Sequence, residues 1–169
     1  MSNNITLRQF SACMELVNES IRNNIDSINA GGCAFFASEL AQRMQAAGIE
    51  DFSIAVFGDV IEDESELVPI EEAINDMLSW DGDLNSIYSW NDNGIHFAHV
   101  VIEWRGIKWD AVEPFEGTKW RGAFQYEGEF PEDSLHAIGQ CSEGWNCMYD
   151  RSQNDTVREI LDCAFDLLH

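Results

Sequence analysis

Two stretches near the amino end of the chain carry apolar residues at helical spacing. In the first, Thr6 followed three positions later by Gln9 predicts a capping box that begins a helix, and we expect this helix to end near Asn29. Its apolar positions recur at steps of three, four and seven: Leu7, Phe10, Met14, Val17, Ile21 and Ile28. The second stretch predicts a helix that closes at Gly48, with one face formed by Cys33, Phe36, Leu40 and Met44. Cys33 therefore falls in the first turn of this second helix.

The rest of the chain combines strand-like alternation with further helical spacing. The expected elements are a buried strand at 52–57, an acidic helix at 69–80, a hairpin of strands at 96–104 and 107–112, short strands within 119–140 and a closing amphipathic helix at 155–168. Helices come first and antiparallel strands follow, without an internal repeat or a linker. The sequence therefore predicts a single α+β domain over residues 1–169, with N-terminal helices packed on an antiparallel sheet.

The hairpin has a register that can be derived from its turn. If Arg105 and Gly106 are the two turn residues, Glu103 lies opposite Lys108, and this opposite-charge pair supports the register. The same register places Trp104 on the face that we expect to pack in the core.

The charge of the chain is strongly acidic. Thirty-one acids against nine bases give a net charge of −22 over 169 residues, so free nucleic acid would be repelled. Residues 59–92 hold eleven acids and no Lys, Arg or His, which is typical of a solvated face or of a surface that binds a basic partner. The 45% of hydrophobic residues nevertheless predicts a folded chain.

Features of secreted and membrane proteins are missing from the sequence. The amino end has no basic segment followed by an apolar run, and no stretch approaches the ~18 apolar residues that a membrane span needs. We therefore expect a cytoplasmic protein without membrane contact. The five cysteines are then expected to be reduced thiols: Cys13, Cys33, Cys141, Cys147 and Cys163.

Cys33 has the placement of a reactive thiol. The first turn of a helix stabilises a thiolate through its unpaired backbone N–H groups and its dipole. Gly31 and Gly32 precede this cysteine, and a backbone without side chains allows close approach of a substrate carbonyl. A small residue buried at a helix start is the commoner role of such a cysteine.

His99 and Asp110 supply the partners that a cysteine nucleophile needs. In the hairpin register above they share one face and are diagonal neighbours, while Trp104 and Trp109 occupy the opposite face. Asp110 could hold one ring nitrogen of His99 and leave the other for Cys33. The three residues therefore predict a Cys-His-Asp catalytic triad.

These residues resemble the papain-like and transglutaminase-like cysteine superfamily. The match consists of Gly-Gly-Cys at 31–33, His99 at the head of a strand and Trp-Asp-Ala-Val-Glu-Pro at 109–114. The resemblance implies a papain-like or transglutaminase-like core and thioester chemistry. In the transglutaminase-like pattern the acid stands just before a proline, which would make Glu113 the third member, whereas the hairpin parity favours Asp110. The glutamine that papain-like peptidases carry before the cysteine is missing, with only Asn29 nearby, so backbone groups would form the oxyanion hole.

The resulting hypothesis is a cysteine-dependent hydrolase or acyl transferase of the peptidase, isopeptidase or amidase type. We expect Gly31, Gly32 and Glu113 to contact the substrate. We also expect the acidic stretch 59–92 to lie beside the cleft and to favour a basic or amine-bearing peptide or protein. The alternative is a non-enzymatic acidic interaction protein, or a charge mimic of nucleic acid, that blocks a basic site on a partner.

Two metal-binding patterns are weaker than the thiol site. Residues 81–92 partly match a calcium loop, but Ser86 replaces the required glycine and Asp92 the final glutamate. A zinc set could be assembled from His96, His99, Cys141 and Cys147, but the spacing of its two cysteines is not that of a usual zinc knuckle. The sequence therefore predicts neither a metal nor a cofactor.

Overall fold

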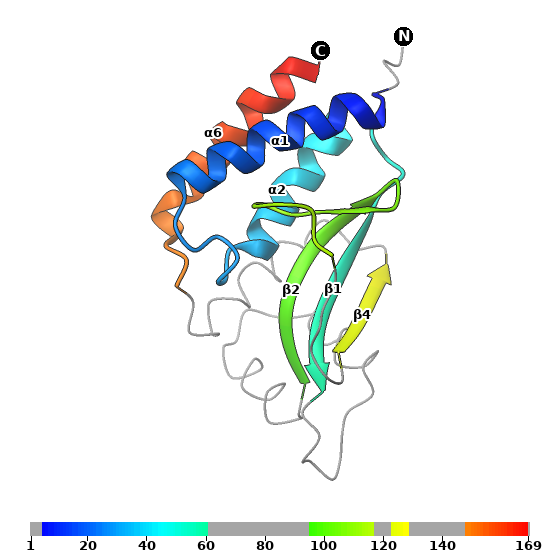
Figure 1. Ribbon diagram of the computed structural model, residues 1–169, viewed down its shortest axis with the longest axis vertical. Helices are drawn as coiled ribbons and strands as arrows, with labels where there is room; N and C mark the ends of the chain where they lie inside the picture. Colours follow the sequence, from blue (N-terminus) through cyan, green and yellow to red (C-terminus); the bar gives the residue numbers. More distant parts are fainter. Residues whose placement is uncertain (1–4, 61–94, 117–122, 129–147, 169) are drawn as a thin grey trace.

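A layer of helices lies beside an antiparallel sheet in the computed structural model, which describes residues 5–60, 95–116, 123–128 and 148–168 (Figure 1). The helices are α1 (Leu7–Asn24), α2 (Cys33–Ala46) and α6 (Asn154–Phe165), with short 3₁₀ turns η2 (Arg151–Gln153) and η3 (Asp166–Leu168) at the ends of α6. α1 packs against α6, while α2 packs against both α6 and the sheet. The expected α+β class is confirmed.

α1 begins as its sequence predicts but ends earlier. Thr6 caps the helix, since its side chain accepts from the Gln9 N–H and Gln9 in turn accepts from the Thr6 N–H. The expected end near Asn29 is wrong, because the backbone becomes extended at Ile25 and Ser27 takes a positive φ of 57°. Ile28 is nevertheless buried. The apolar spacing thus extends past the end of α1 into a loop, where tertiary packing buries Ile28 without a helix.

α2 follows the prediction closely. It starts at Cys33, with Gly32 as its N-cap, and ends two residues before Gly48, whose φ of +79° is the left-handed conformation common after a helix.

Among the described residues, no helix is both long and apolar enough to cross a membrane.

In the part of the chain that the structure describes, the sheet has four strands: β1 (Ser53–Val60), β2 (Ile95–Trp104), β3 (Ile107–Trp109) and β4 (Ala123–Gly128). Their order is β3-β2-β1-β4 and every neighbouring pair is antiparallel. β1 extends three residues beyond the strand expected at 52–57, and β4 confirms a strand within 119–140. The helix expected at 69–80 lies outside the described residues, as does nearly all of the acidic stretch 59–92.

The hairpin of β2 and β3 has the predicted register. Glu103 pairs with Lys108 across the strands, with 3.1 Å between the carboxylate and the ammonium, and Arg105 and Gly106 both take positive φ in the turn. The expected second strand to residue 112 is wrong, because β3 ends at Trp109. Asp110 lies beyond the strand, where its carboxylate accepts from the Ala111 N–H and its backbone carbonyl accepts from the Asn18 side chain.

An aromatic cluster joins the helices to the hairpin. The ring of Phe10 on α1 lies edge-on to Trp104 and Trp109, with centroids 4.9 and 5.0 Å apart, and 6.0 Å from Phe165 of α6. Both tryptophans are buried in this core, as the hairpin parity predicts. The other face of the sheet carries a smaller cluster of Ala55, Phe57 and Val101, covered by Phe115.

Truncating the centre of this aromatic cluster tests the packing of α1 on the hairpin. Because Phe10 is fully buried, we expect Phe10→Ala to lower the free energy of unfolding by about 3–5 kcal/mol in urea denaturation. Leu7→Ala is the matched control on the same helix, since Leu7 is exposed, and should change it by less than about 1 kcal/mol. Equal effects of the two changes would contradict this packing.

Candidate active site

Cys33 is the first residue of α2, at the N-terminus of the helix, and only 4% of its surface is exposed. Among the described residues, its backbone N–H has no backbone acceptor, as expected for the first residue of a helix. The other cysteines described are a buried Cys13, whose pKa burial raises to about 11, and an exposed Cys163. Cys33 is thus the described cysteine that combines burial with a helix amino terminus.

The glycine before Cys33 is required by packing. A Cβ at Gly32 would lie 2.8 Å from both the Ile28 carbonyl oxygen and the Ile28 Cδ1, and 2.9 Å from the Tyr149 ring. The Gly32 N–H donates to the Ile28 carbonyl at 2.7 Å, so this N–H is not available to a substrate. Gly31 has a φ of 120°, which side-chain-bearing residues rarely adopt. Both glycines therefore have conformational roles, and their expected contact with a substrate stays a prediction.

The segment that precedes α6 holds this glycine turn in place. The N–H groups of Met148 and Tyr149 both donate to the Ala30 carbonyl, at 3.1 and 3.3 Å. The Tyr149 hydroxyl donates to Asn154 at 2.7 Å, which fixes the ring beside Gly32. The residues just before η2 and α6 thus support the turn that leads into α2.

His99 and Asp110 form a buried pair. His99 Nε2 lies 2.8 Å from Asp110 Oδ2, and the two residues are 6% and 4% exposed. Because an ionised carboxylate only accepts hydrogen bonds, Nε2 carries the hydrogen in this pair. The other ring nitrogen, Nδ1, is outside this pair, and Cys33 lies near enough to His99 to raise the pKa of the imidazole. The structure therefore brings together the three residues expected to form the triad.

Opposing effects set the protonation of His99. Burial lowers its pKa, but hydrogen bonds with Asp110 and Cys33 and the negative charge of both groups outweigh burial and raise the pKa to about 10. The imidazolium form is thus stabilised by Asp110 and Cys33 together.

The acid is fixed by donors that the sequence did not reveal as site residues. Asp110 Oδ2 also accepts from the Asn29 amide at 3.1 Å, and Oδ1 accepts from the Ala111 N–H at 2.6 Å. The buried Asn18 of α1 donates to the Asp110 carbonyl at 2.7 Å. Asn29, considered above only as a neighbour of an oxyanion hole, instead positions the carboxylate. The signal for Asn18 was its place one turn after Met14 on the apolar face of α1.

The loop after β3 covers the imidazole. The Phe115 N–H donates to the Lys108 carbonyl at 2.8 Å, which closes residues 108–115 into a compact loop. The Phe115 ring then lies 4.8 Å from the His99 ring and 4.9 Å from Phe57. Neither the periodicity nor the spacing of the sequence indicated this contact, because it depends on how the loop folds back.

His99 lies in the interior of β2, not at the strand's head as expected. The register of β1 against β2 shifts beside it, since Phe57 pairs with His99 but Gly58 pairs with Phe97. Such irregularities bend a strand and redirect side chains. The shift is therefore suited to turning His99 toward the helix mouth.

The alternatives for the acid are separated by geometry. Asp110 contacts His99, whereas Glu113 is exposed and forms no described contact with the ring.

Of the proposed metal patterns, residues 81–92 and both Cys141 and Cys147 lie outside the described residues. Within the described ranges, no group of three or more His, Cys, Asp or Glu side chains is arranged to hold a metal ion.

Comparison with protein-family models, curated proteins and solved structures finds no match to this chain.

The raised pKa of His99 predicts a pH-dependent stability. In the unfolded chain an imidazole titrates near 6.5, and in the folded protein near 10. Between these values the folded state binds more protons than the unfolded state, so the stabilisation is complete below pH 6.5 and is lost as pH rises through 10. Urea denaturation between pH 6 and 10 should show a smaller loss of stability for His99→Gln than for the wild type. Parallel curves for the two proteins would refute the assignment.

Removing the buried amide of Asn18 tests how the acid is held. Asn18→Ala leaves the Asp110 carbonyl without this donor and should cost about 1–3 kcal/mol of stability. Asn24→Ala is the control on the same helix, because the exposed Asn24 bonds only to Ser20 one turn before, and it should cost less than about 0.5 kcal/mol. Thermal unfolding followed by circular dichroism measures both, and a neutral Asn18→Ala would count against the role assigned to Asn18.

Proposed function

We propose that this protein is a cysteine-dependent hydrolase or acyl transferase, with Cys33 as nucleophile, His99 as acid and base, and Asp110 as the group that orients the imidazole. The observation that carries the proposal is the buried His99, which contacts Asp110 at 2.8 Å through Nε2 and whose pKa Cys33 and Asp110 both raise. This division of roles is what covalent catalysis by a thiol requires.

The chemistry follows from the position of the proton. With the proton on His99, the Cys33 sulfur attacks the substrate carbonyl carbon and forms a carbon–sulfur bond. As the tetrahedral intermediate collapses, the imidazolium gives its proton to the leaving amine or alcohol, and a thioester remains on the sulfur. Water or an acceptor amine then attacks the thioester and gives its proton to His99, and the Cys33 sulfur leaves as thiolate.

The oxyanion of the intermediate needs donors at the helix mouth. The Cys33 N–H is favourably placed, because no backbone acceptor among the described residues occupies it and because the helix dipole favours negative charge there. The Gly32 N–H is excluded, since it donates to Ile28.

The arrangement of elements also supports a papain-like or transglutaminase-like core as part of this proposal. The nucleophile opens a helix that packs on an antiparallel sheet, the histidine lies on β2, and the acid follows the adjacent strand β3. The net charge of −22 favours a basic or amine-bearing peptide or protein as substrate.

Alkylation of single cysteines tests the proposal. In the folded protein at pH 6, we expect iodoacetamide to modify Cys33 faster than the exposed Cys163, which serves as an internal control, and mass spectrometry of peptides separates the two. His99→Ala should slow modification of Cys33 by about tenfold or more, because an unassisted thiol is mostly protonated at this pH. Cys163 should react equally in both proteins.

The two candidate acids provide a matched pair of variants. Asp110→Asn should slow Cys33 alkylation at pH 6, since it weakens the hold on imidazolium, whereas Glu113→Gln should leave the rate within about twofold because Glu113 is exposed. Circular dichroism verifies that both variants fold. The proposal is contradicted if Cys33 of the wild type reacts no faster than Cys163. It is also contradicted if the rate at Cys33 does not change in His99→Ala.

A further inference from the structure

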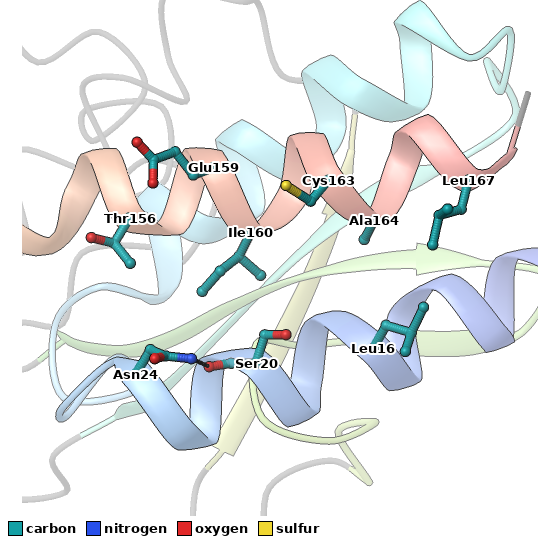
Figure 2. Close-up of a pocket in the computed structure, with 9 residues that line it drawn as sticks. All are labelled: Leu16, Ser20, Asn24, Thr156, Glu159, Ile160, Cys163, Ala164 and Leu167. Atoms are coloured by element: carbon teal, nitrogen blue, oxygen red, sulfur yellow. Dashed lines mark hydrogen bonds between the residues drawn. The ribbon is translucent and has the colours of Figure 1, made fainter.

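A shallow groove lies between α1 and α6, separate from the thiol site. Figure 2 shows the side chains that line it. Its volume is about 400 Å³. The residues that form its floor are Leu16 and Ser20 from α1 with Ile160, Cys163, Ala164 and Leu167 from α6 and η3. Asn24, Thr156 and Glu159 complete the lining, so Glu159 is its one charged residue and most of its other large side chains are apolar.

Large apolar side chains in the groove face solvent. Leu16 is 45% exposed and Leu167 is 72% exposed. In the described part of the chain, exposed large hydrophobic residues comprise these two together with Leu7 and Met148. Two of the four therefore meet in one groove, which is a concentration typical of an interaction site rather than of scattered surface leucines.

The rims of the groove are acidic on both sides. Four exposed acids each directly precede a groove residue on the same helix: Glu15 before Leu16, Glu19 before Ser20, Glu159 before Ile160 and Asp166 before Leu167. One residue is a rotation of about 100° around a helix, which places these acids on the solvent side of the floor. None of the four has an ion-pair partner among the described residues.

The arginines of the two helices are largely engaged elsewhere. Arg22 donates to the Val112 carbonyl, and Arg158 pairs with Glu39 and Asp155. Arg8 lies about two turns before Leu16, at the amino end of α1. In the described structure these arginines are therefore not paired with the acids at the rims.

We propose that the groove binds an amphipathic helix of a basic partner protein, with apolar residues on the floor and Lys or Arg side chains against the acidic rims. From Thr156 to Leu167 the groove spans about 16 Å, which matches three turns of helix. Charge complementarity selects this occupant. A second copy of the chain carries the same charge of −22, and an anionic membrane surface would meet the same repulsion.

A designed peptide tests the groove without knowledge of the natural partner. The probe is a fluorescein-labelled helical peptide of about three turns, with leucines on one face and lysines on both flanks, and its binding to the full chain is followed by fluorescence anisotropy. A scrambled peptide of the same composition separates amphipathic recognition from general attraction to an acidic protein. The amphipathic peptide should bind at least about tenfold more tightly than the scrambled one. At saturation it should also slow maleimide modification of Cys163, which lines the groove.

Matched variants locate the binding site. Leu16→Ser with Leu167→Ser, and separately Glu19→Lys with Glu159→Lys, should each weaken binding by about tenfold or more. Their controls are Leu7→Ser, an exposed leucine outside the groove, and Glu50→Lys with Glu116→Lys, which makes the same change in net charge on other exposed acids. The controls should stay within about twofold.

The proposal is overturned if the scrambled peptide binds equally well, if the control charge reversal weakens binding as much as the rim reversal, or if Cys163 stays unprotected. It is also overturned if sedimentation shows a wild-type dimer that Leu16→Ser with Leu167→Ser dissociates, because the groove would then be an interface between copies. Each outcome is independent of Cys33 reactivity.

Discussion

The buried carboxylate of Asp110 is the constraint on which the candidate site depends. At 4% exposure its charge is removed from water, and it must be compensated by donors within the protein. His99, Asn29 and the Ala111 N–H supply these donors at 2.6–3.1 Å. The carboxylate therefore orients the imidazole of His99, which interacts with Cys33.

This constraint also links the two layers of the fold. Asn29, in the turn before α2, and His99, on β2, both donate to the Asp110 carboxylate, while Asn18 of α1 donates to the Asp110 backbone carbonyl. The turn that carries Asn29 continues into α2, and Tyr149 packs against this turn and donates to its Ala30 carbonyl. Loss of the acid would therefore disturb the contact between helices and sheet as well as the protonation of the thiol's partner.

The described structure contains acidic residues that are buried and paired and others that are exposed and unpaired. Where acids are buried they are paired, as in Glu39, which is 8% exposed and contacts Arg43 and Arg158 at 2.7 and 3.0 Å. At the rims of the groove between α1 and α6 the acids are exposed and unpaired in the described structure. Buried acids thus hold elements together, while those at the groove rims are available to a basic partner.

The sequence by itself determined the capping box at Thr6, the start of α2 at Cys33 and the hairpin register that pairs Glu103 with Lys108, because each depends on neighbours within a few residues. That register also placed His99 and Asp110 on one side. Only the tertiary structure decided that α1 ends at Asn24, that Phe115 covers His99 and that Asn29 holds Asp110. These features bring together residues up to 81 positions apart, and their pairing is set by packing and buried charge, which no local pattern records.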